Sequence, residues 1–477
     1  MNDVFVYPLQ NSKEYKDVIN SIQNNKGSLL VNGLLPVQRP NIAYSLFKDL
    51  NKQMVFVASS DLEAKKVYED LNFYMKDKVE YLGFSDIFFY HLDAKDRNEE
   101  ARKLKVLLKL AKGEEIVLVT SIEAILKKYV PKEVLLENTT TYKVGDVVNL
   151  EEMSNRLVSL GYERVSKIEG FGQFSIRGGI IDVFSLEYNN PIRMELFDDE
   201  IDSIRTFDVF SQKSIDKIKE FSITPSREFI YPENIDSAVV RIREDVVKTT
   251  DDDVFNNIDK ISNKNYFQGV ENYIDYIYTN ENKSLFTYLN EDALIFYNDI
   301  SRVKERCENY LNEFRENYKL NLERGLALKE QGKLLYQYSD LEFISEGRKL
   351  ILNSLLPKPI NDFNVKSIVN FDVREVPSFN AKVNELAEEI NRLKYNGYKI
   401  VLATNTYDRA KKLNSDLLDL GIECTITQDR DIEIKSSQVI IIPGRISSGF
   451  EYKSIKFIII TDNEMIGVHK RNSTAKS

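Results

Sequence analysis

The sequence is poor in the residues that build metal sites and disulfides. It has 477 residues, with only two cysteines (Cys307, Cys424) and two histidines (His91, His469). Structural zinc sites usually take four cysteine or histidine ligands, so these scattered residues predict no metal site. The two cysteines lie far apart in sequence and are expected to stay reduced, which favours a cytoplasmic location.

The sequence also lacks a long apolar run and an excess of basic residues. It has no stretch of about 18 apolar residues, and the N-terminal segment MNDVFVYPLQ does not have the basic and then apolar pattern of a signal peptide. We therefore expect no membrane contact. With 65 Lys and Arg against 75 Asp and Glu, the net charge is -10, which argues against broad adhesion to nucleic acid.

One nucleotide-binding motif is present in outline only. The segment GSLLVNGLLPVQRPNIAYSLF (27–47) has the strand, loop and helix of a phosphate-binding loop, and Gly33 holds its first glycine position. The later glycine, lysine and serine positions hold Gln38, Arg39 and Pro40. Gln38 carries a Cβ where backbone must approach phosphate, Arg39 is bulkier than lysine, and Pro40 offers neither hydroxyl nor N–H. The sequence therefore predicts a non-functional nucleotide site, no catalytic residues and no cofactor.

The acidic half of such a site is missing as well. The apolar strand IVLVTS (116–121) is not followed by the carboxylates that hold magnesium in working NTPases. Asp462 and Glu464 follow a later apolar strand and resemble such a pair, but no phosphate-binding loop precedes them in that part of the chain. We interpret them as capping or solvated residues.

The alternation of strands and helices predicts an α/β protein in several units. We expect a split parallel-sheet domain with an inserted antiparallel α+β domain, followed by a second small α/β domain that folds independently. The predicted ranges are 1–130 for the first part of the split domain, 131–206 for the inserted domain, 207–373 for a helical second part, 374–470 for the second α/β domain, and 471–477 for a linker tail.

Side-chain alternation in the inserted domain predicts an outer polar face. In two of its strands Phe174, Ile176, Ile192, Met194 and Leu196 share the apolar side, and Ser175, Arg177, Arg193, Glu195 and Phe197 share the other. Arg164, on the preceding strand, is a further candidate for the outer face. Several arginines beside an exposed phenylalanine suit a protein partner. A cross-strand Arg–Glu pair on a solvated face is the alternative.

The run FGQFSIRGGIIDVFSLEYNNPIRMELFDDEIDSIRTFD (171–208) resembles the signature of the second domain of UvrB and of the N-terminal module of bacterial transcription-repair coupling factors. The resemblance extends over essentially the whole chain and is strongest at about 145–225; IIITDNEMIG (458–467) resembles the coupling factor's third domain. It implies a docking surface for UvrA at Arg164, Arg177, Arg193 and Glu195. A further arginine of the UvrB pattern is replaced by Ser175.

The degenerate loop separates the two relatives, because UvrB keeps an intact one and the coupling factor's module does not. The resemblance thus implies the UvrA-recruiting part of a coupling factor. ATP and magnesium would belong to a C-terminal motor absent from this chain, as would contacts with RNA polymerase and DNA, and a C-terminal domain would mask the UvrA-binding surface.

Two alternatives remain. One is a UvrB-type damage-recognition ATPase, although the segment GFSDIFFYHLDAKDRNEEARKL (83–104) is too short for that protein's aromatic β-hairpin. The other is a stand-alone adaptor.

Overall fold

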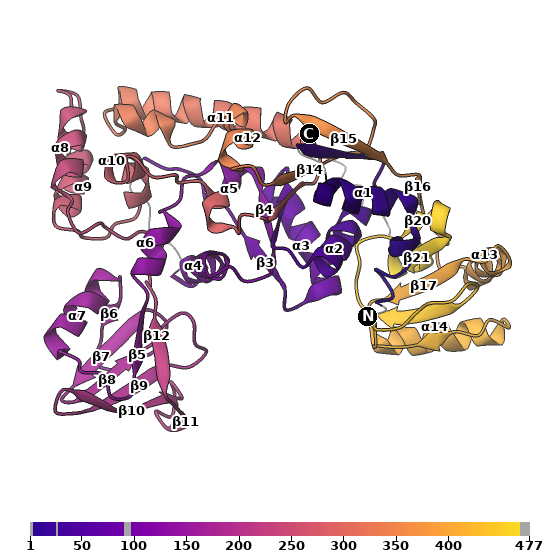
Figure 1. Ribbon diagram of the computed structural model, residues 1–477, viewed down its shortest axis with the longest axis horizontal. Coiled ribbons are helices and arrows are strands. Elements are labelled where there is room, and N and C mark those ends of the chain that lie inside the picture. Colours follow the sequence, from indigo (N-terminus) through magenta and orange to yellow (C-terminus); the bar gives the residue numbers. More distant parts are fainter. Residues whose placement is uncertain (1–2, 25–26, 90–96, 468–477) are drawn as a thin grey trace, which may run out of the picture.

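The computed structural model describes residues 3–24, 27–89 and 97–467. Among these residues, no helix is long and apolar enough to cross a membrane. Figure 1 shows a central body, with an inserted unit suspended on one side and a third unit docked on the other. The expected α/β class, with an inserted antiparallel unit and a second small α/β unit, is confirmed. The expected linker tail lies outside the described residues.

The body is built on a seven-stranded parallel sheet in the order β15-β1-β14-β13-β2-β4-β3. Its strands are β1 (Ser28–Asn32), β2 (Met54–Ala58), β3 (Val79–Leu82), β4 (Val117–Ser121), β13 (Leu294–Tyr297), β14 (Lys349–Ser354) and β15 (Val365–Asn370). The central strands are apolar without alternation, because helices cover both faces of the sheet. Alternate residues of β2 accordingly enter two different cores, Phe56 on one side and Val57 on the other.

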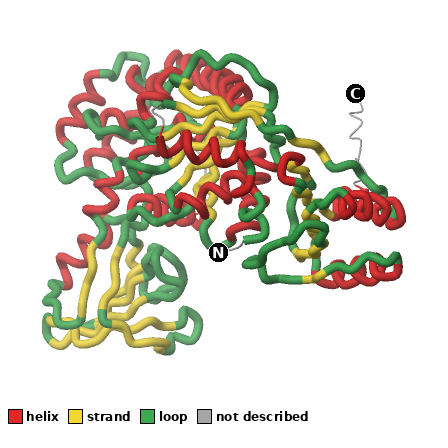
Figure 2. The backbone as a smooth tube through the Cα atoms, turned by 45° about the vertical axis from the view of Figure 1, so that its right-hand side comes forward, coloured by secondary structure: helices red, strands yellow, loops and turns green. Residues whose placement is uncertain are grey.

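Helices α1, α2 and α3 pack on one face of this sheet, and α4, α5 and α11 pack on the other. Figure 2 shows the sheet between these two layers. The bounds are α1 (Lys13–Asn24), α2 (Gln38–Leu50), α3 (Asp61–Met75), α4 (Arg97–Ala111), α5 (Ile122–Leu126), α6 (Lys132–Glu137), α8 (Asp236–Glu244), α9 (Asp252–Ser262), α10 (Ile274–Ile277), α11 (Ile300–Glu323) and α12 (Leu341–Ile344).

The range 207–373 is less helical than the sequence predicted. Strands β13, β14 and β15 all lie in it, so the central sheet is closed by the second half of the split domain. Their short apolar runs, such as LIFY in β13, stand between long charged helical stretches, where a four-residue strand gives little signal of its own.

The inserted unit is a six-stranded sheet in the order β11-β10-β9-β8-β7-β6, antiparallel except for the β6–β7 pair. A two-stranded ribbon of β5 and β12 lies beside it. The bounds are β5 (Thr140–Lys143), α7 (Leu150–Ser159), β6 (Glu163–Arg164), β7 (Gln173–Arg177), β8 (Ile180–Val183), β9 (Ile192–Phe197), β10 (Glu200–Phe207), β11 (Ser214–Ile218) and β12 (Glu220–Ile223).

The inserted unit therefore extends beyond the boundary expected at residue 206. β11 pairs with β10, and β12 returns to pair with β5, which closes the unit near residue 223. Strand β11 could not be recognised from the sequence, because four of its five residues are exposed and no apolar alternation marks it.

The third unit has a six-stranded sheet in the order β16-β20-β21-β17-β19-β18. Its elements are β16 (Val373–Glu375), α13 (Val383–Tyr395), β17 (Lys399–Thr404), α14 (Tyr407–Asp419), β18 (Thr425–Ile426), β19 (Val439–Pro443), β20 (Phe450–Tyr452) and β21 (Phe457–Thr461). The third unit also has the short helical turns η6 (Lys453–Ile455) and η7 (Asn463–Gly467), and the body has η1 (Leu9–Asn11), η2 (Val270–Tyr273), η3 (Leu285–Tyr288), η4 (Lys329–Lys333) and η5 (Tyr338–Asp340).

This third unit does not have a core of its own on both faces. Helices α13 and α14 cover one face of its sheet. The other face, which includes Val401, Ile440 and Phe450, belongs to the same buried cluster as α2 and α3 of the body. The expectation that the unit folds independently is at odds with this shared core, because separation would expose a whole apolar sheet face to water.

Candidate protein-docking surface and nucleotide-loop segment

The inserted sheet has one apolar and one polar face, as the alternation predicted. Helix α7 packs Met153 and Leu157 against Phe174, Ile181 and Met194 on the inner face. The strand register places Ser175, Asp182, Arg193 and Arg205 in one row across the outer face, and Arg177, Ile180, Glu195 and Ser203 in the next. Arg177, Arg193 and Glu195 are therefore brought together on one surface.

Arg193 is anchored rather than free. Its Nε donates to Asp182 Oδ1 at 2.7 Å and its Nη2 donates to Asp182 Oδ2 at 2.8 Å. Its guanidinium lies 4.4 Å from the centre of the Phe207 ring. The hydrogen bonds to Asp182 raise the pKa of Arg193. Because the Asp182 side chain is only 2% exposed, Arg193 also compensates a buried charge.

Arg177 and Glu195 are more accessible. The Arg177 side chain is 53% exposed and reaches the same carboxylate, with Nη2 at 3.1 Å from Asp182 Oδ2. Glu195 forms an ion pair with Arg205 and accepts a hydrogen bond from Ser203 Oγ at 3.3 Å. The sequence missed Asp182 and Arg205, which lie in the same two rows of the face and could have been found from the alternation.

Arg164 and Ser175 are not exposed on the outer face as the sequence predicted. Arg164 is exposed in the edge strand β6, opposite Phe174, whose side chain enters the inner core. The register thus places Arg164 on the Phe174 side of the sheet, away from Arg177. Ser175 does point outward, but it is buried and donates to the carbonyl of Ser166 at 3.2 Å.

A loop explains the burial of Ser175. Residues 165–172 fold over this end of the outer face, and Ile168 packs there with Phe184 and Phe207 in a small second core. Phe197 and Phe210 lie beyond this cover and are 80% and 90% exposed. The open part of the outer face therefore consists of Arg177, Glu195 and the exposed Phe197 beside the anchored Arg193.

The nucleotide-loop remnant is closed by backbone. Gly33 has φ +90°, and a Cβ added to it would lie 2.3 Å from the carbonyl oxygen of Phe371, in the segment after β15. The N–H of Phe371 donates to the Asn32 carbonyl at 2.9 Å, and the N–H of Gly33 donates to the Ser354 carbonyl at 3.0 Å. Gly33 is thus needed for close packing of neighbouring backbone.

The three substituted motif residues are all buried at the start of α2. Gln38 accepts from the N–H of Leu35 at 3.0 Å and donates to the Glu451 carbonyl of the third unit at 3.3 Å. The helix begins at Gln38. Pro40 is therefore its third residue, still in the first turn, where the missing N–H breaks no helical hydrogen bond.

Arg39 is 1% exposed and poorly partnered. Its Nη1 lies 3.4 Å from Asn298 Oδ1 and its Nη2 lies 3.9 Å from Asp299 Oδ2, while Nε and Nη2 have no hydrogen-bond partner. Burial lowers the pKa of Arg39, although Asp299 opposes that shift. Arg39 therefore points across the ends of the strands toward β13 and α11.

Asp462 and Glu464 form local hydrogen bonds. Glu464 Oε2 accepts from the N–H and hydroxyl of Thr461 at 2.9 and 2.7 Å. Asp462 accepts from the N–H of Asn405 at 2.8 Å and pairs with Arg409 at 3.2 Å. Both carboxylates are buried and already satisfied.

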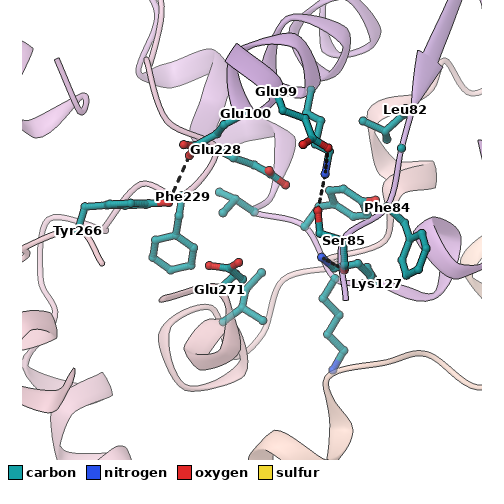
Figure 3. Close-up of a pocket in the computed structure, with 16 residues that line it drawn as sticks. Leu82, Phe84, Ser85, Glu99, Glu100, Lys127, Glu228, Phe229, Tyr266 and Glu271 are labelled. Carbon is teal, nitrogen blue, oxygen red and sulfur yellow. Dashed lines mark hydrogen bonds and ion pairs between the residues drawn. The ribbon is translucent and has the colours of Figure 1, made fainter. Parts of the chain in front are cut away.

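A pocket lies in the body next to α4, and part of its wall comes from the segment that follows β12 (Figure 3). Its wall carries Glu99, Glu100, Glu228 and Glu271 beside three lysines. Figure 3 shows the contact between Glu100 and Tyr266. Lys103 Nζ donates to Ser85 Oγ at 2.6 Å. Burial raises the pKa of Glu100, Arg227 opposes that rise, and the charge of Glu271 adds to it. The wall therefore carries charges of both signs.

Comparison with known proteins now identifies the relatives. Residues 141–229, which include the whole sheet of Arg177 and Arg193, match the family model of the UvrB interaction domain. The chain resembles transcription-repair coupling factors along almost its whole length. It is 28% identical to the coupling factor of Bacillus subtilis over 472 residues, which is 96% of this chain and 40% of the relative.

Two further coupling factors agree with this match. The chain is 25% identical to that of Staphylococcus haemolyticus over 98% of its length and 27% identical to that of Staphylococcus aureus over 92%. It spans about 40% of the length of these coupling factors. Among solved structures, S. tokodaii Xpd4 covers 90% of this chain with 10% identity and a TM-score of 0.23, too low to support an argument.

Proposed function

We propose that this chain is the UvrA-recruiting part of a transcription-repair coupling factor in transcription-coupled nucleotide excision repair. It acts as a docking module in the cytoplasm and hydrolyses no ATP itself. ATP-driven movement on DNA and the grip on RNA polymerase belong to the remainder of the full-length protein, beyond the roughly 40% of the coupling factors that this chain spans. A C-terminal domain of that remainder covers the docking surface until UvrA is needed.

One observation carries the proposal. The family match at 141–229 covers the strands that present Arg177, Arg193 and Glu195 together. Arginines beside exposed aromatic rings are typical of the few residues that dominate protein interfaces. Arg177 is the best single probe, since more than half of its side chain is exposed while Arg193 continues to compensate Asp182 when Arg177 is removed.

The test is a titration of UvrA with wild type, Arg177→Ala and a control, Arg243→Ala. Arg243 is a similarly exposed arginine, paired with Asp259, on α8 outside the inserted unit. We expect Arg177→Ala to lose about 2 kcal/mol of binding free energy, as for a charged hot spot, and Arg243→Ala to bind like wild type. Melting curves show whether each variant is folded. Equal UvrA affinity for all three proteins would reject the docking assignment.

A further inference from the structure

The inserted unit is joined to the body by very little apolar surface. Its own apolar residues form separate clusters around α7 and the outer loop. Among the described residues of 140–223, Leu186 is the only one counted in the buried core of the body. Two chain segments cross between the parts, near α6 and after β12 (Figure 1).

Charged contacts along α4 hold the two parts together instead. At the start of α4, Arg97 Nη1 lies 2.9 Å from Glu163 Oε2 of β6. One turn later, Glu100 Oε2 lies 3.7 Å from Arg227 Nη1 in the segment that follows β12. Just after α4 ends, Lys112 forms an ion pair with Glu187 in the loop after β8. A helix of this length separates the outer contacts by about 20 Å, so together they fix an angle.

Arg227 is the central member of this set. Its guanidinium stacks 3.6 Å from the centre of the Tyr266 ring, on the body side. On the other side its side chain passes over Gly161, where an added Cβ would lie only 2.6 Å from Arg227 Cγ. Glu100, its partner carboxylate, also lies 3.4 Å from the Tyr266 hydroxyl and forms part of the pocket wall (Figure 3).

We propose that the ion pairs Arg97–Glu163, Glu100–Arg227 and Lys112–Glu187 form an electrostatic latch that sets the angle between the inserted unit and the body. Partly exposed charge pairs weaken as salt screens them, whereas the separate cores of the two parts do not. Opening the latch therefore leaves both parts folded and frees the inserted unit to swing on its two connecting segments. Small, polar contacts between domains permit such motion.

The latch decides where the outer face of the inserted unit points relative to the body. It does not depend on which partner that face binds, and it is tested without any partner. Single-molecule energy transfer between dyes on the two parts reports the angle directly. Dyes are attached at Asp202→Cys on β10 and Glu316→Cys on α11, both exposed positions, in a Cys424→Ser background. Cys307 is buried and stays in place.

The latch variant is Arg97→Gln/Lys112→Gln, which leaves Arg227 and its packing intact. The matched control is Arg243→Gln/Lys333→Gln, which removes two ion pairs inside the body. We expect one narrow distance distribution for wild type and control at about 50 mM salt and a broad one for the latch variant. At about 1 M salt, wild type and control should broaden to match the variant, which changes little.

A charge exchange provides a second test. Arg97→Glu alone should broaden the distribution, and Arg97→Glu/Glu163→Arg should narrow it again. Circular dichroism melts identify any variant that has simply unfolded, in which case the salt series on wild type decides. A narrow distribution at every salt concentration, or equal broadening in control and latch variant at low salt, would overturn the proposal.

Discussion

Two arginine–aspartate pairs show how differently the body and the inserted unit use the same chemistry. In the nucleotide-loop remnant, the arginine is the buried partner: Arg39 is 2% exposed in its side chain, Asp299 is 15% exposed, and their closest approach is 3.9 Å. On the inserted sheet the order is reversed, with Asp182 2% and Arg193 17% exposed at 2.7 Å. The first pair is largely buried in the body, and the second lies on the outer face of the inserted sheet.

A charged motif residue has to be interpreted together with its surroundings. Arg39 is buried at the start of α2 and reaches Asn298 and Asp299 of the body, so its charge lies in the protein interior. Arg193 lies on the outer face beside the loop 165–172, and its charge pairs with Asp182 on that face. Four experiments test this difference between the body and the inserted unit.

The largest effect should come from disrupting the core that the third unit shares with the body. Phe450 of β20 is fully buried in the core shared by the third unit and the body. Phe450→Ala should lower the free energy of unfolding by about 3–5 kcal/mol, because it leaves a cavity at the joint. Chemical denaturation measures this. The control is Phe343→Ala, a phenylalanine that is 82% exposed, for which we expect a loss below about 0.5 kcal/mol. Equal effects would mean that the two units do not share a core.

The second experiment compares the two arginines directly. Arg193→Met should cost about 2–4 kcal/mol of stability, since Asp182 stays buried with only Arg177 to compensate it. Arg39→Met should stay within about 1 kcal/mol of wild type, because an apolar side chain suits a buried site where two guanidinium nitrogens lack partners. Asp299 keeps its role at the start of α11, where it accepts from the N–H of Arg302 at 3.2 Å. Denaturation of both variants tests this, and a larger loss for Arg39→Met would refute it.

The third experiment measures how stability depends on pH at Asp70 of α3, where the body contacts the third unit. Burial raises the pKa of Asp70 to about 6, although Ser447 donates to both of its oxygens from the third unit. A carboxyl with a raised pKa in the folded state is destabilising when ionised. Its penalty is fully present well above pH 6 and disappears as the pH falls through 6 toward the unfolded value. Lowering the pH from about 7 to about 5 should thus stabilise wild type relative to Asp70→Asn by about 1 kcal/mol.

A paired series of denaturation curves at the two pH values gives this difference, and other titrating groups cancel between the two proteins. Glu69 raises the pKa of Asp70 and Arg445 lowers it, so both must be left unchanged. If the stability difference between wild type and Asp70→Asn is the same at both pH values, Asp70 does not titrate in this range.

The sequence predicted well which residues of β7 and β9 face the core and which face outward. It predicted poorly which loops and distant segments pack over those faces. Alternation placed Met194 inside and Arg193 and Glu195 outside, because a strand must direct successive side chains to opposite faces. It could not show that Ser175 is covered, since the loop that packs Ile168 over it is a tertiary contact without a local signal. The strand β13 and the cover over Gly33 were missed for the same reason: both depend on segments distant in sequence.

The smallest expected effect is that of ATP, to which we expect no response. A ligand that binds the folded state must raise the melting temperature with concentration. We expect no rise at millimolar ATP and magnesium and no phosphate release, because backbone of Phe371 packs directly against Gly33 and Gln38 is tied to Glu451. Restoring the motif with Gln38→Gly/Arg39→Lys/Pro40→Ser should not restore binding, since the space for phosphate stays filled. A concentration-dependent rise in the restored variant alone would show that residue loss, not closure, inactivates the site; a rise in wild type would show that the site is not closed at all.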